Sequence, residues 1–113
     1  MTYALATVKG VYTNPIGMVP CVGQVVWFPS SPIVDTANHV TLAIPNDQVA
    51  LDVNGQFSVQ VLPTDTANVS SFAWAFRPAI SGVPGAIQYL LVPLAGMPGG
   101  GWFIDQLSSA PGY

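Results

Sequence analysis

The sequence predicts an all-β fold, and more narrowly a single β-sandwich of about seven strands with immunoglobulin-like or transthyretin-like topology. Short apolar runs are separated by turn residues, which include eleven prolines and eleven glycines. The expected strands recur at intervals of about 8–12 residues, a spacing that is typical of sandwiches. Neither an internal repeat nor a second domain is visible, so we expect 1–113 to form one domain that ends in a short docking segment at about 95–113. An eight-stranded jelly roll or a small barrel is the alternative fold.

The first half of the chain contains three expected strands. The second strand carries Cys21, Val25 and Trp27 on one face and is apolar on both faces near its end. We therefore expect it to be central in a sheet or covered on two sides. The three strands are 4–12, 20–28 and 40–44, and they are connected by a turn at 13–17, a loop at 29–38 and a turn at 45–47.

The clearest local pattern is a β-hairpin over 48–63. A two-residue Asn54-Gly55 turn would set apolar residues of one arm opposite polar residues of the other. A type I turn that starts at Asp52, with Gly55 in the left-handed conformation and a bulge after it, makes one face wholly apolar. A wholly apolar face fixes the register against a core, so we predict this three-residue hairpin, defined by Asp52, Asn54 and Gly55. The residues expected to face each other are Leu51 and Phe57, and Val49 and Val59.

The second half of the chain contains two further long strands. In one of them Phe72, Trp74 and Phe76 alternate with smaller residues and are expected to point inward, and the other is apolar on both faces. Asp65 or Thr66 could cap one helical turn in the polar connection that precedes them. The segments are a connection at 64–70, strands at 71–78 and 87–94, a flexible glycine-rich loop at 95–101, and a short strand or one helical turn at 102–107.

The chain carries very little charge. Charged residues make up 6% of it, against about 25% in typical soluble domains. Two basic residues and a net charge of −3 exclude binding to a row of phosphates, so we expect no nucleic-acid partner. Scarce charge favours a surface that is partly covered by other subunits, and a neutral surface rich in small polar residues is the alternative.

We expect neither a membrane span nor a secretory signal. The most apolar region, 86–104, is interrupted by Gln88, prolines and glycines, and the N-terminus lacks a basic-then-apolar order. Cys21 is the only cysteine, so no intrachain disulfide forms, and we interpret it as a buried structural thiol.

Few residues are suited to catalysis or metal binding. His39 is the only histidine; Asp35 and two serines are near it in sequence, but no nucleophile-elbow motif is present. The chain has no glutamate, and its five aspartates are scattered, mostly in turns. A calcium loop starting at Asp52 would need an acid where Pro63 stands, and an Asp35/His39 metal pair lacks further ligands. We therefore predict no enzyme activity, no cofactor and no metal.

Aromatic and apolar residues supply the candidate contact surface. Trp102, Phe103 and Ile104 follow the glycine-rich loop, where aromatic residues are favoured as docking anchors. Leu90 and Val92 lie on the strand that is apolar on both faces, so they are also interface candidates. The tryptophans could instead line a carbohydrate platform, although alternating aromatic residues on strands usually form a core.

The order of features resembles small minor tail proteins of long-tailed phages that infect actinobacteria. The likeness covers about residues 8–107, and it departs from the family pattern at 70–75, where Gly-Thr-x-Tyr with following charges is common. The matching residues are Val22, Gly23, Val25, Val26, Phe28 and Pro29, then Leu51, Asp52, Gly55, Phe57, Ser58, Leu62, Pro63 and Asp65, and finally Tyr89, Leu91, Pro93, Asp105 and Leu107.

The resemblance implies a non-enzymatic structural or adaptor component of a virion. Such a protein would be a minor tail protein in the distal tail or tail tip, present in multiple copies and assembled with other virion proteins in the host cytoplasm. The alternatives are a tail module that binds a host cell-envelope glycan and a capsid decoration protein of the same fold.

Overall fold

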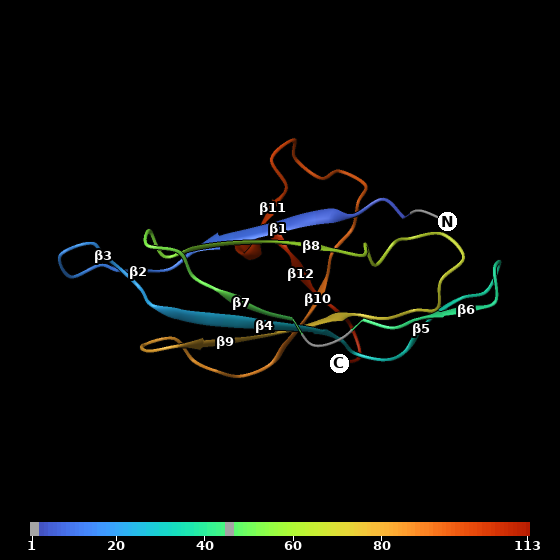
Figure 1. Ribbon diagram of the computed structural model, residues 1–113, viewed down its shortest axis with the longest axis horizontal. Helices are drawn as coiled ribbons and strands as arrows, with labels where there is room; N and C mark the ends of the chain where they lie inside the picture. Colours follow the sequence, from blue (N-terminus) through green and yellow to red (C-terminus); the bar gives the residue numbers. More distant parts are fainter. Residues whose placement is uncertain (1–2, 45–46) are drawn as a thin grey trace.

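The computed structural model describes residues 3–44 and 47–113, and it is an all-β protein (Figure 1). Within these ranges no α-helix forms, and one 3-10 turn, η1, covers Ile104–Gln106. Two residues of the expected turn at 45–47, Pro45 and Asn46, lie outside the described residues. The strands are β1 (Ala6–Val11), β2 (Thr13–Asn14), β3 (Val19–Pro20), β4 (Gly23–Pro29), β5 (Ile33–Asp35), β6 (Val40–Leu42), β7 (Asp47–Ala50), β8 (Gln56–Val61), β9 (Trp74–Ile80), β10 (Gln88–Leu91), β11 (Trp102–Phe103) and β12 (Ser108–Ser109).

The strands form four separate sheets. The largest has the order β12-β10-β9-β4-β7, and a three-stranded sheet has the order β11-β1-β8. Strands β2 and β3 form one small hairpin, and β5 and β6 form another. The prediction of an all-β fold is confirmed, but a single seven-strand sandwich is not, because the strands divide among four sheets.

Strand β4 is central in the larger sheet, as expected from its two apolar faces. It pairs antiparallel with β9 on one side and with β7 on the other. The register sets Trp27 opposite Phe76, so two large aromatic side chains lie side by side on the inner face, with ring centroids 4.9 Å apart. Aromatic pairs of this kind add stability beyond the area they bury.

The turn of the predicted hairpin is confirmed, but the predicted pairing between its two arms is wrong. Gly55 is left-handed at φ 71°, and its N–H donates to the Asp52 carbonyl over 3.0 Å, while Asp52 N–H donates to the Gln56 carbonyl. Asn54 does not have the positive φ that a two-residue type I′ turn requires. Beyond Gln56, however, the arms separate: β7 pairs with β4, and β8 pairs with β1.

The expected pairs across the hairpin are therefore absent from the register. These pairs are Leu51 with Phe57 and Val49 with Val59. The physical reason is that each arm places its apolar residues against the shared core from a different sheet. The alternation that predicted one apolar face is the same in both arrangements, so periodicity alone could not distinguish them.

Three connections also differ from expectation. The predicted loop at 29–38 contains β5, because Ile33 is fully buried in the core and Asp35 is 3% exposed. No helical turn forms at 64–70; the Asp65 carboxylate instead accepts the N–H groups of Leu94 and Ala95. At 102–107 both alternatives occur, because β11 is followed directly by η1.

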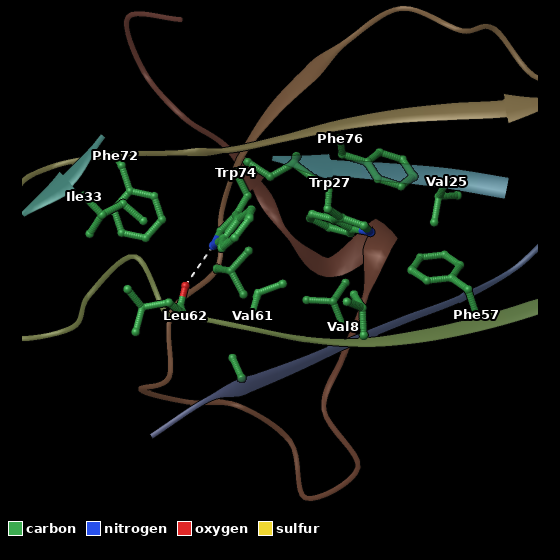
Figure 2. Packing of buried hydrophobic residues seen from close by; sticks show 14 of the residues in the cluster. Val8, Val25, Trp27, Ile33, Phe57, Val61, Leu62, Phe72, Trp74 and Phe76 are labelled. Atoms are coloured by element: carbon green, nitrogen blue, oxygen red, sulfur yellow. Dashed lines mark hydrogen bonds between the residues drawn. The ribbon is translucent and has the colours of Figure 1, made fainter. Parts of the chain in front are cut away.

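The core lies between the two larger sheets (Figure 2). Phe57 of β8 stacks on Phe76 of β9 with ring centroids 6.2 Å apart, a contact that joins the two sheets. Trp74 packs edge-on against both Phe72 and Trp27. The prediction that Phe72, Trp74 and Phe76 point inward is confirmed, since all three are at most 4% exposed.

The molecule is elongated, with extents of 52 × 28 × 24 Å. The β2–β3 hairpin projects from one end and the β5–β6 hairpin from the other (Figure 1). Among the described residues, no helix is long and apolar enough to cross a membrane.

Candidate docking surface

Five exposed large apolar side chains, including the four most exposed ones among the described residues, lie at the end that carries the β2–β3 hairpin. We call this set the apolar tip and define it as five residues. The exposed fractions are 84% for Ile16, 72% for Met18, 55% for Val19, 86% for Val22 and 90% for Val53. Single exposed apolar residues are normal, whereas a contiguous group of them is typical of an interaction site.

The β2–β3 hairpin is built by local turn chemistry. The Asn14 side-chain oxygen accepts the Ile16 N–H over 2.9 Å, and Gly17 takes the left-handed conformation at φ 79°. Met18 follows with φ 52°, a conformation that costs most L-residues roughly 1 kcal/mol or more. The turn therefore holds an apolar side chain outward in a backbone conformation that glycine or asparagine adopts more readily.

Val53 joins this end through close backbone contacts between the 52–55 turn and the base of the hairpin. Tyr12 N–H donates to the Gly55 carbonyl over 2.9 Å, and Cys21 N–H donates to the Tyr12 carbonyl over 3.0 Å. A side chain at position 55 would meet the Tyr12 carbonyl oxygen. Only glycine fits there, so Gly55 sets both the turn conformation and the close approach of the two segments.

A groove of about 490 Å³ runs along this end, between the hairpin and the turn after β9. Its lining includes Pro15, Val19, Val22 and Val83. No charged residue occurs between Lys9 and Asp35, so neither the hairpin nor the strand that follows it carries charge. The hairpin part of the tip can therefore exchange water for apolar contact without desolvating an ion, and the exposed Asp52 lies beside Val53 at its border.

The interface residues expected from sequence fall into two groups. Leu90 and Val92 are 4% and 0% exposed, so the expectation that they form a surface is wrong; they belong to the core of this chain. Trp102 and Ile104 are half-buried, and the Trp102 indole N–H donates to the Pro93 carbonyl over 2.7 Å. Phe103 is 43% exposed, and the Lys9 Nζ lies 4.6 Å from the centre of its ring.

The outer faces of the central strands are largely covered by this chain itself. Val26 of β4 lies between Gln48 and Arg77 in the register and is 4% exposed. Tyr89 of β10 is half-buried and stacks on the C-terminal Tyr113 with ring centroids 5.4 Å apart. The two-sided apolar pattern of these strands is thus explained mostly by internal packing, and the four most exposed apolar side chains belong to the tip.

The Asp35 and His39 region forms a structural network. The Asp35 carboxylate accepts the Tyr3 hydroxyl over 2.6 Å, the Asn38 side-chain N–H over 2.9 Å, and the backbone N–H groups of Ala37 and Asn38. These donors, led by Tyr3, lower the pKa of Asp35 to about 2. His39 is exposed and is not among the hydrogen-bond donors to that carboxylate.

The remaining candidate site residues are engaged in turns or packing. Ser30 Oγ accepts the Ala73 N–H, and Ser31 Oγ lies 3.5 Å from the Ser71 carbonyl, so both hydroxyls are engaged with the segment before β9. In the described part of the chain, no three His, Cys, Asp or Glu side chains gather to hold a metal ion. Cys21 packs against the core but is half-buried, so the predicted full burial of its thiol is wrong.

Sequence reasoning missed the tip because it treated 13–17 as a connecting turn. The available signal was Ile16 and Met18, two apolar residues that flank Gly17 within a turn and have no core to pack against there.

No protein-family model, curated protein or solved structure matches this chain.

Proposed function

We propose that this protein is a non-enzymatic structural subunit that assembles by inserting its apolar tip into a neighbouring protein of a phage particle. The observation that carries the proposal is the tip itself: four apolar side chains at one end of the molecule are each at least 72% exposed, and three of them lie in a stretch of the sequence without charge. Exposed apolar side chains on a projecting hairpin are suited to bind a complementary apolar pocket of a neighbouring protein.

The magnitudes favour assembly in several copies. Burying a valine, isoleucine or methionine side chain gains about 1.5–3 kcal/mol, and this applies to each of the five tip residues. The gross gain of roughly 7–15 kcal/mol is similar to the association cost of about 4–15 kcal/mol. A single tip therefore binds weakly, and repeated copies in one particle would make the attachment stable.

The place in a virion rests on the resemblance to minor tail proteins and on the scarcity of charge. The distal tail is the position we propose, with other virion proteins as partners; a capsid decoration protein would use the same tip at another position.

The fold supports a finer proposal as well. Because Phe57 and Phe76 stack between two facing sheets, we propose an open β-sandwich related to the immunoglobulin-like or transthyretin-like class.

Two experiments test this function. Mass spectrometry and electron microscopy of purified particles of the encoding phage should detect the chain and locate it in the tail. Val22→Asp and Val53→Asp should then strongly reduce incorporation, whereas Ile87→Asp, at an exposed apolar residue outside the tip, should not. Absence of the chain from particles, or equal incorporation of all three variants, would reject the proposal.

A glycan-binding module is the second candidate, and Phe103 is the residue that favours it, since its ring is partly exposed beside Lys9. Against it, the Trp102 indole is half-buried and its N–H is used internally. Saturable binding to host envelope that is lost in Phe103→Ala would favour this candidate over the first.

A further inference from the structure

Strand β8 forms an unprotected edge of the smaller sheet. Among the described residues it pairs with β1 alone, and its sequence, Gln-Phe-Ser-Val-Gln-Val, contains no charge and no proline. Natural edge strands usually carry a lysine, a proline or a bulge that prevents pairing with another chain. Here the bulge lies before the strand, at Gly55, and the residues that follow are regular.

The register identifies which backbone groups of β8 point away from β1. In an antiparallel pair, alternate residues exchange hydrogen bonds with the partner strand, and the residues between them direct N–H and C=O outward. The Tyr12 N–H bond to the Gly55 carbonyl extends the β1–β8 register and fixes this alternation. Phe57, Val59 and Val61 therefore bond to β1, and Gln56, Ser58 and Gln60 face the open edge.

Gln56 provides an independent check of this assignment. Its N–H donates to the Asp52 carboxylate and its carbonyl accepts the Asp52 N–H, both over 2.9 Å and both on the side away from β1. At the other end of the strand, the Leu62 carbonyl accepts the Trp74 indole N–H. Between these two ends, Ser58 and Gln60 are the residues of β8 that direct backbone groups toward the open edge.

We propose that a second copy of this chain pairs with β8 in an antiparallel, two-fold arrangement centred on Val59. Ser58 and Gln60 are placed symmetrically about Val59, so Ser58 would exchange two hydrogen bonds with the partner's Gln60, and Gln60 would exchange two with the partner's Ser58. Every N–H and C=O that Ser58 and Gln60 direct outward is then used. The register also keeps Val59 of both copies on the core face, so the three-stranded sheets join into one continuous sheet.

A second copy fits this edge better than an unrelated strand. A longer strand gains little, because Asp52 occupies the edge at one end and Leu62 is engaged at the other. The exposed side chains of β8 itself are Gln56, Ser58 and Gln60, so the paired strands of two copies meet without charge repulsion between them. A groove of about 480 Å³ lies beside β8, between it and β7, and its lining includes Val49 and Phe57 together with Lys9 and Asp52. Two-fold dimers are also the commonest closed assemblies.

The test is the oligomeric state measured by sedimentation across protein concentration, combined with amide exchange by NMR. We expect a reversible dimer in which exchange of the Ser58 and Gln60 amides slows as concentration rises. Ser58→Pro removes an outward N–H and leaves the bonds to β1 intact, so it should weaken the dimer by about 30-fold through one lost bond per copy. Ser58→Ala keeps the N–H and should dimerise like the wild type.

Gln60→Lys provides a second variant if Ser58→Pro fails to fold, because it places like charges across the two-fold axis. A protein that stays monomeric at all concentrations, or a dimer that neither variant weakens, overturns the inference. Val22→Asp distinguishes it from the proposed docking function: the β8 dimer should survive this tip substitution. If Val22→Asp abolishes the dimer while Ser58→Pro does not, self-association runs through the tip and the β8 pairing is wrong.

Discussion

The indole N–H of Trp74 donates a 2.8 Å hydrogen bond to the backbone carbonyl of Leu62, which ties β9 of the larger sheet to the end of β8 in the smaller one (Figure 2). The bond is fully buried. Trp27, which packs against Trp74, is equally buried, yet the Trp27 indole N–H has no hydrogen-bond partner among the described residues. The two tryptophans therefore contribute differently, although both lie in one aromatic cluster.

We expect Trp74→Phe to destabilise the protein more than Trp27→Phe. The first leaves the Leu62 carbonyl unsatisfied inside the core, and the second removes an indole N–H that already lacks a partner. Both lose similar volume, so the difference in the free energy of unfolding should be about 1–3 kcal/mol. Urea denaturation of the two variants measures it. Equal losses would mean that the hydrogen bond between the sheets adds nothing.

Gly55→Ala should be far more harmful than Gly82→Ala. Both glycines have positive φ, 71° and 87°, so both substitutions carry the left-handed penalty of roughly 1–2 kcal/mol. At Gly82 nothing lies within 4 Å of the added methyl group, whereas at Gly55 the methyl group meets the Tyr12 carbonyl. Thermal unfolding should therefore show a clearly lower Tm for Gly55→Ala. Indistinguishable Tm values would contradict the close approach of the two segments.

Asp35 should make stability depend on pH in the acid range. Its folded-state pKa is lowered from 3.8 to about 2, chiefly by the Tyr3 hydroxyl, so the unfolded chain binds the proton more readily. The stabilising contribution of the Asp35 carboxylate to the free energy of unfolding is present above about pH 4 and is lost as the pH falls toward 2. Asp35→Asn should flatten this part of the profile, and Tyr3→Phe should move the loss to higher pH. An unchanged wild-type slope in Asp35→Asn would exclude this carboxylate as the cause.

Two substitutions at Met18 should differ in stability but not in docking. Both Met18→Gly and Met18→Ala remove the apolar side chain from the tip, but only glycine relieves the left-handed backbone at φ 52°. We expect Met18→Gly to be more stable than Met18→Ala by about 1 kcal/mol. Both should weaken incorporation into particles equally. A variant that retains full incorporation would show that Met18 lies outside the contact.

Local features of this fold were readable from the sequence because they depend on neighbouring residues. Asp52 and Gly55 define their turn through bonds within five residues, and the alternation of Phe72, Trp74 and Phe76 marks one face of a strand. Scarce charge also indicated an apolar surface. These inferences require only that side chains alternate and that particular turns need particular residues.

The tertiary structure alone decided which sheet each strand joins and which apolar residues stay exposed. The arms of the 48–63 hairpin divide between two sheets because β4 and β1 offer them partners that are distant in sequence. Leu90 and Val92 are buried while Ile16 and Val22 are exposed, although all four are apolar. Periodicity gives the faces of a strand, but it does not identify the element that packs against each face.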